Sequence, residues 1–179
     1  MSRIVTFYSY KGGVGRSMLL ANVAWLAARW GRRVLCLDWD LEAPGLHHYL
    51  PPPTGRDRSD GILDLLLSAS PDWRAITQDV RLDGAGRLSM IHAGRDDGGF
   101  LGRLRELDWE RRIPEGLGNA IETWRTEWLE AYELVLVDCR TGVSDVGAIG
   151  AAQLPDLLVT VLNANDQGDR KSTRLNSSH

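Results

Sequence analysis

The residues with the clearest chemical potential form a short glycine-rich run, Tyr10–Ser17, whose sequence is YKGGVGRS. Glycines let the backbone adopt unusual dihedral angles, so that successive N–H groups can line a concavity and approach an anion closely. The glycines of this run are Gly12, Gly13 and Gly15. Ser17 stands where a hydroxyl ligates Mg²⁺, and Arg16 stands where a lysine normally reaches the β- and γ-phosphates. The run therefore predicts a phosphate-binding loop with one unusual basic residue.

Arg16 changes what this loop is expected to do. A guanidinium binds phosphate through two donors, but it is wider and more rigid than an ammonium group. Nucleotide binding is therefore expected, whereas the rate of hydrolysis stays open. A dinucleotide-binding loop is rejected, because the spacing G-x-G-x-x-G needs a glycine where Met18 stands.

The segments on either side of the loop have the order that a phosphate loop requires. Residues 4–8 (IVTFY) have the composition of a buried strand, and residues 17–30 have helical spacing with Gly31 as the stop. A glycine-rich turn without a ligand is the alternative, and the order strand, loop and helix argues against it.

Carboxylates follow two further apolar strands. Asp38 and Asp40 lie at the end of the first, residues 33–39, and Asp138 lies at the end of the second, residues 134–139. In open α/β sheets, ligand-binding groups gather at the carboxyl ends of the strands, so these carboxylates are expected to face the phosphate loop. The alternatives are solvated loop carboxylates and a buried strand that ends in aspartate for no functional reason.

Together these motifs resemble a known family. KGGVGRS resembles the deviant Walker A motif, KGGxGK[ST], of the MinD/ParA group of P-loop ATPases, and FYSYKGGVGRS resembles a bacterial subgroup with a variant KGGVGR motif. The resemblance implies an α/β fold, a P-loop NTPase three-layer sandwich with a mostly parallel sheet. It also implies ATP and Mg²⁺ as cofactors, and a homodimer around nucleotide in which Lys11 reaches the partner's nucleotide.

The resemblance further implies roles for single residues. Those implied in catalysis are Lys11, Arg16 and Asp40. Mg²⁺ binding is implied for Ser17 directly, and for Asp38 and Asp138 through water. Those implied in nucleotide binding are Gly12, Gly13, Val14, Gly15, Arg16, Ser17, Met18 and Gly142. In this scheme Asp40 positions the attacking water and Gly142 contacts the γ-phosphate. Arg140 is expected to form an ion pair with Asp38 or Asp40, or else to face the nucleotide.

The composition of the chain separately indicates a functional role for Lys11. The chain has two lysines, Lys11 and Lys171, whereas its other basic side chains besides histidine are arginines. A lysine in such a chain suggests a need for a compact and flexible ammonium group at position 11. Chance is the alternative.

The whole chain limits the class of protein. Its 179 residues suit one domain, and 43% hydrophobic with 25% charged residues is an ordinary soluble globular composition. No apolar run is long enough to cross a bilayer, there is no room for a signal peptide, and Cys36 and Cys139 fall in expected buried strands. A cytoplasmic protein with reduced thiols is therefore expected. A net charge of −3 gives no support for nucleic-acid binding.

The end of the chain, Asp169–His179, is expected to lie outside the fold. Its sequence, DRKSTRLNSSH, back-translates to a string that resembles a sequencing adapter, which indicates an artefact. We therefore expect the ATPase domain to occupy residues 1–168, to be incomplete at its C-terminal end, and to continue in the natural protein with further strand–helix units. A genuine polar tail is the alternative.

The rest of the pattern alternates strands with helices, as in a mostly parallel sheet. His47 and His48 are expected at the surface, because adjacent residues do not share a helix face and no metal-ligand partners are nearby. Further strands are expected at residues 88–92 and 157–162. Helices are expected at residues 61–68, 71–78, 114–132 and 145–153, and a glycine- and aspartate-rich loop at 94–102.

These observations favour an Mg²⁺-dependent ATP-binding switch domain with slow ATP hydrolysis and nucleotide-dependent dimerisation. It would form the N-terminal part of a larger bacterial regulatory or signalling protein with an unidentified protein partner. One alternative is a scaffold module that binds nucleotide without hydrolysing it, because of Arg16. Another is a bacterial tyrosine kinase, which shares this fold and usually carries a C-terminal tyrosine cluster that the chain does not show.

Overall fold

A single mixed sheet forms the centre of the molecule. The computed structural model describes residues 1–51, 60–68, 72–81, 85–95, 97–140 and 149–163. The strands are β1 (Arg3–Ser9), β2 (Arg33–Asp38), β3 (Gln78–Asp79), β4 (Arg87–Ile91), β5 (Leu134–Arg140) and β6 (Leu157–Thr160). Their order in the sheet is β3-β4-β2-β5-β1-β6. β3 pairs antiparallel with β4 and the other neighbouring pairs are parallel, which confirms the expected mostly parallel α/β sheet.

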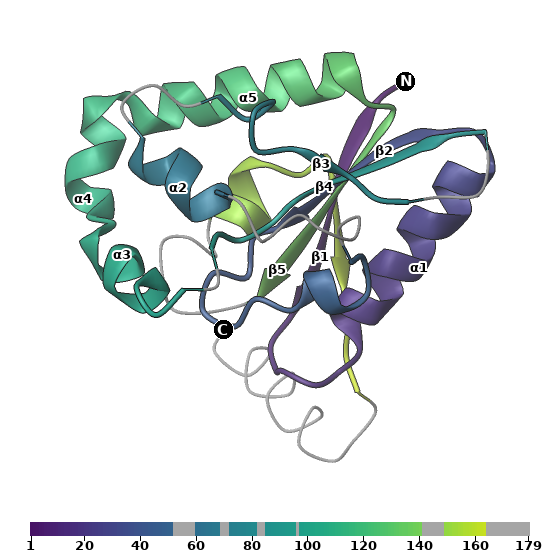
Figure 1. The fold of residues 1–179 in the computed structure, drawn as a ribbon, viewed down its shortest axis with the longest axis horizontal. Helices are drawn as coiled ribbons and strands as arrows, with labels where there is room; N and C mark the ends of the chain where they lie inside the picture. The colour runs from purple at the N-terminus through teal and green to yellow at the C-terminus, as the bar shows by residue number, and fades with distance from the viewer. Residues whose placement is uncertain (52–59, 69–71, 82–84, 96, 141–148, 164–179) are drawn as a thin grey trace, which may run out of the picture.

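Helices cover both faces of this sheet, so the fold has the three expected layers. Figure 1 shows α1 (Arg16–Arg29) on one side, with α2 (Ile62–Leu67) and α5 (Gly118–Ala131) on the other. Successive residues of a strand point to opposite faces, and β5 shows the consequence. Leu136 is buried in the core under α1, whereas Val137 is buried in the core under α2 and α5.

The strand register brings the predicted chemical residues to one edge of the sheet. β2 and β5 are neighbours, and Asp38 lies opposite Asp138. β1 lies on the other side of β5, with its last residue, Ser9, opposite Arg140. The glycine-rich run then leads from β1 into α1 at the lower edge of Figure 1. The three central strands therefore end where the loop begins.

The helix expected at 71–78 is wrong for its described residues. Residues 73–76 form a turn, with the N–H of Thr77 donating to the carbonyl of Arg74 at 3.3 Å, and Gln78 already belongs to β3. Trp73 is buried, and its ring lies edge-on to that of Trp128 with centroids 6.4 Å apart. Burial of this large side chain outweighs the local helical preference of the segment.

The helix expected at 114–132 is interrupted. α4 (Trp109–Arg112) is followed by a π-helical turn (Ile113–Leu117), and the regular helix α5 begins at Gly118. The interruption lies at Gly116, whose φ of 108° is outside the helical region and is accessible mainly to glycine.

Three other expected segments differ in extent. The loop expected at 94–102 already contains the start of α3 (Phe100–Glu106). Of the helix expected at 145–153, the described part is a π-helical turn (Ile149–Gln153), and residues 145–148 lie outside the described residues. The last expected strand ends at Thr160 rather than at residue 162.

Both cysteines lie in the core, as expected. Cys36 and Cys139 are buried and carry free thiols. Burial raises the pKa of the Cys139 thiol to about 12 and that of Cys36 further, so both are inert protonated packing groups. Among the described residues, no helix has the length and apolar character needed to cross a membrane.

Candidate functional site

The glycine-rich loop has the backbone conformation of an anion cradle. Gly13 and Gly15 have φ angles of 76° and 83°, in the left-handed region that favours glycine. α1 starts directly after Gly15, and no side chain caps its N-terminus. The first-turn N–H groups and the positive end of the helix dipole therefore face the loop, which suits a phosphate group.

A hollow of about 210 Å³ lies inside this loop. It is lined by Ser9, by every residue from Lys11 to Met18, and by Asp40, Ala43 and Tyr49. Sites for whole small molecules usually measure about 300–1,000 Å³, so this hollow suits a phosphate tail rather than an entire nucleotide. All of the loop residues expected to bind nucleotide, from Gly12 to Met18, thus lie together at one hollow.

Arg16 turns inward from the start of α1 and makes three contacts. Its Nη2 donates to Oδ2 of Asp40 at 2.8 Å, its Nη1 donates to Oγ of Ser9 at 3.1 Å, and its Nε donates to Oδ1 of Asp138. The Arg16 side chain is 7% exposed. In this structure the guanidinium therefore lies among carboxylates, on the side of the loop away from solvent.

These contacts add to the sequence analysis in two ways. Asp40 pairs with Arg16. The side chain of Arg140, expected to pair with Asp38 or Asp40 or to face the nucleotide, lies outside the described residues. Ser9 was not singled out at all. Its position at the end of β1, just before the loop, is the signal that could have identified it.

Asp38 and Asp138 form a buried acidic pair. Both are fully buried, and burial raises the pKa of each above its ordinary value; the Asp138 charge raises the pKa of Asp38 further, whereas Arg16 opposes the rise for Asp138. Oδ2 of Asp38 accepts from the N–H of Leu46 at 3.2 Å. Oδ1 of Asp38 and Oδ2 of Asp138 have no hydrogen-bond partner.

These orphaned oxygens fit a hydrated divalent cation. Ser17, the expected direct ligand, has its hydroxyl hydrogen-bonded to Asp138, so hydroxyl and carboxylates already lie together. No group of three or more His, Cys, Asp or Glu side chains among the described residues forms a full metal-binding set. Mg²⁺ in phosphate-binding sites does not need one, because it keeps several waters and shares its coordination with the phosphates. Ser17, Asp38 and Asp138 would hold it here.

The acidic pair predicts an unusual pH dependence. A carboxyl whose pKa is raised by folding stabilises the fold below its ordinary pKa of about 4, and this contribution is lost as pH rises through the raised value. The free energy of unfolding of the metal-free chain should therefore fall as the pH rises from about 4 toward neutral. Asp38→Asn should flatten the dependence of the free energy of unfolding on pH. It should also raise this free energy at pH 7 by about 1 kcal/mol, because replacing a strained functional residue commonly stabilises a fold.

Urea unfolding at several pH values measures this slope. Asp79→Asn, which replaces a carboxylate that is 60% exposed on the same sheet, should keep the wild-type slope. An Asp38→Asn variant that is less stable than wild type at pH 7 would contradict the account.

The remaining expected residues occupy different surroundings. Lys11 is exposed at the rim of the hollow, and Met18 is exposed beside it, whereas Val14 is half-buried. Gly142, expected at the γ-phosphate, lies outside the described residues.

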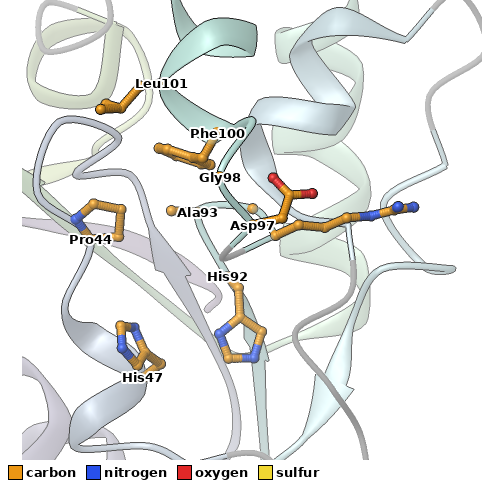
Figure 2. A pocket seen from close by; sticks show the side chains of 10 residues that line it. Pro44, His47, His92, Ala93, Asp97, Gly98, Phe100 and Leu101 are labelled. Atoms are coloured by element: carbon orange, nitrogen blue, oxygen red, sulfur yellow. The ribbon is translucent and has the colours of Figure 1, made fainter.

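A second hollow, of about 280 Å³, lies beyond the segment that follows Asp40. Figure 2 shows Pro44 and His47 from that segment, and His92 and Phe100 from the other side. His48 is exposed as expected, but His47 is half-buried and lines this hollow. The hollow shares no lining residue with the loop hollow.

Solved structures have the same fold. The septum site-determining protein MinD of Pyrococcus horikoshii, complexed with Mg-ADP, aligns with a TM-score of 0.70 at 21% identity, over 99% of this chain and 66% of that chain. The chimerical protein CapA2B2 aligns with a TM-score of 0.68 at 19% identity, over 98% and 70%. The fold is that of a P-loop NTPase of the MinD/ParA type, and the glycine-rich loop and the converging aspartates lie together at one edge of its sheet.

Two curated proteins have sequences similar to this chain. It is 33% identical over 163 residues to EpsB of Ralstonia solanacearum, a candidate tyrosine-protein kinase. It is 27% identical over 161 residues to the succinoglycan biosynthesis transport protein ExoP of Rhizobium meliloti. Each match covers 90% of this chain, but the chain spans only 19% and 18% of these relatives. No family model matches the chain.

Proposed function

We propose that the chain is an Mg²⁺-dependent ATP-binding switch domain of a larger bacterial regulatory protein, with slow ATP hydrolysis and nucleotide-dependent dimerisation. The observation that carries this proposal is the convergence of an uncapped helix N-terminus, a glycine-lined hollow and three aspartates at one sheet edge. Phosphoryl transfer requires mainly positioning and charge stabilisation, and these groups supply both.

Each group has a defined task in this proposal. The N–H groups from Gly12 to Ser17 bind the phosphates, and the hydroxyl of Ser17 completes the metal site with Asp38 and Asp138. Mg²⁺, when bound, neutralises charge that develops on the β- and γ-phosphates. Asp40 accepts a hydrogen bond from the attacking water and orients it. Arg16 binds phosphate once it leaves the carboxylates.

Lys11 is proposed to act on the nucleotide of a partner copy. It is exposed at the rim of the hollow, whereas Arg16 at the other end of the loop is buried. Lys11→Ala should weaken dimerisation in the presence of a slowly hydrolysed ATP analogue by about tenfold or more, and should change analogue binding far less. Sedimentation velocity and calorimetry measure the two effects. Lys171→Ala, which replaces the other lysine of the chain, is the matched control.

An equal loss of dimerisation and binding in Lys11→Ala would remove the case for a role in the partner's site. No loss in either would remove Lys11 from the mechanism altogether.

A tyrosine-kinase domain is the second candidate, because the EpsB match extends over 90% of this chain. One experiment separates the candidates: the chain is incubated with γ-labelled ATP and a tyrosine-containing peptide. Slow phosphate release that is lost in Asp40→Asn supports the switch, and phosphotyrosine supports the kinase. ATP binding with neither product supports a non-hydrolysing scaffold, and turnover restored by Arg16→Lys would then identify Arg16 as the cause.

A further inference from the structure

The buried ionic cluster at the loop contains one cation. Among the buried side chains that the structure describes, Arg16 is the one arginine or lysine, and it contacts Asp40 and Asp138. Its contacts go to Asp40 and Asp138, two of the carboxylates that the proposed mechanism assigns to the metal shell and to the attacking water. The guanidinium thus already binds Asp138, one of the carboxylates that a bound divalent cation would use.

Ser9 fixes the guanidinium in this position. Oγ of Ser9 accepts from Nη1 of Arg16 at 3.1 Å and donates to the carbonyl of Lys11 at 3.0 Å. Ser9 is 1% exposed. The inward position of Arg16 is therefore connected by hydrogen bonds to the backbone of the phosphate loop itself.

We propose that Arg16 is an internal counter-cation that competes with the divalent metal for Asp138. A metal that binds the unpartnered Oδ2 of Asp138 shares this carboxylate with the guanidinium on Oδ1, and the two positive charges repel each other. Displacing the guanidinium is also unfavourable, because the buried positive charge then lacks a partner. A phosphate in the loop supplies that partner, since a guanidinium binds phosphate well. Metal and phosphate therefore favour each other's binding, and this coupling is reciprocal. The inference rests on the proposed nucleotide site.

The test measures Mn²⁺ binding by electron paramagnetic resonance, without nucleotide, on the purified chain. The wild type should bind Mn²⁺ weakly, Arg16→Gln should bind it about tenfold more tightly or better, and Arg16→Lys should lie between them. Arg87→Lys is the matched control. This variant weakens the ion pair of Arg87 with Asp79, whose side chains are 57% and 60% exposed and 2.9 Å apart. It should leave Mn²⁺ affinity unchanged.

Equal Mn²⁺ affinities in wild type, Arg16→Lys and Arg16→Gln would overturn the competition. If Arg16→Gln does not fold, the comparison between Arg16→Lys and wild type decides, and equal affinities overturn the proposal. The result is separable from the proposed function. If Arg16→Gln binds Mn²⁺ more tightly but the chain does not bind ATP, the competition is supported and the ATP site is refuted. If the chain binds ATP but Mn²⁺ affinity does not change, the ATP site is supported and the competition is refuted.

Discussion

Gly13→Ala is expected to weaken ATP binding by about 100-fold or more, equivalent to about 2.7 kcal/mol, while the chain stays folded. Gly13 lines the loop hollow, and a Cβ built on it meets no atom within 4 Å, so the fold itself has room for the methyl group. The loss arises because the methyl group occupies space that the phosphate needs and because alanine disfavours the φ of 76°.

Gly31→Ala is the matched control for this result. Gly31 has a similar φ of 87°, and a Cβ there also meets no atom within 4 Å, but it follows α1 at the far end from the loop. Both variants should lose about 1–2 kcal/mol of stability from the left-handed backbone conformation. Only Gly13→Ala should lose ATP affinity, as measured by calorimetry. Similar ATP affinities in the two variants would show that the nucleotide does not approach the loop at Gly13.

Arg16→Met is expected to lower the free energy of unfolding of the metal-free chain at pH 7 by about 3–5 kcal/mol, because buried carboxylates lose their counter-charge. The control is Arg32→Met. Arg32 contacts Glu133 at 2.8 Å, the same distance as Arg16 to Asp40, but the two side chains are 62% and 34% exposed. Exposed pairs contribute about 0–1 kcal/mol, so the control should lose far less.

The loss of stability in Arg16→Met should depend on pH, because it depends on the charge of Asp138. Burial already raises the pKa of Asp138, so this carboxyl takes up a proton more readily when Arg16 is gone. The loss should therefore shrink as pH falls, and Asp138→Asn in the same chain should recover part of it. Urea unfolding measures both. A loss below about 1 kcal/mol at pH 7 would mean that the guanidinium is not a structural counter-charge.

The loop and the acidic strand ends were predictable because each depends on local pattern. A strand, three glycines and a helix in series determine the anion cradle, and carboxyl ends of parallel strands meet at one edge whatever their separation in sequence. The register then placed Asp38 opposite Asp138. These are features that depend on order along the chain and on sheet geometry.

The inward turn of Arg16 was not predictable in the same way. It depends on Asp40 and Asp138, which lie 24 and 122 positions away, and on the burial of both carboxylates. The turn at Trp73 has a similar origin, because contact with Trp128 overrides the local helical pattern. Long-range electrostatics and packing of large side chains decide these details, and neither has a local sequence signal.

ATP binding measured calorimetrically with and without Mg²⁺ tests the central claim most directly. The account predicts that the wild type binds ATP, that Mg²⁺ strengthens this binding, and that ATP raises the temperature of thermal unfolding. A chain that binds neither ATP nor ADP under either condition, with no shift in thermal unfolding, would contradict the account.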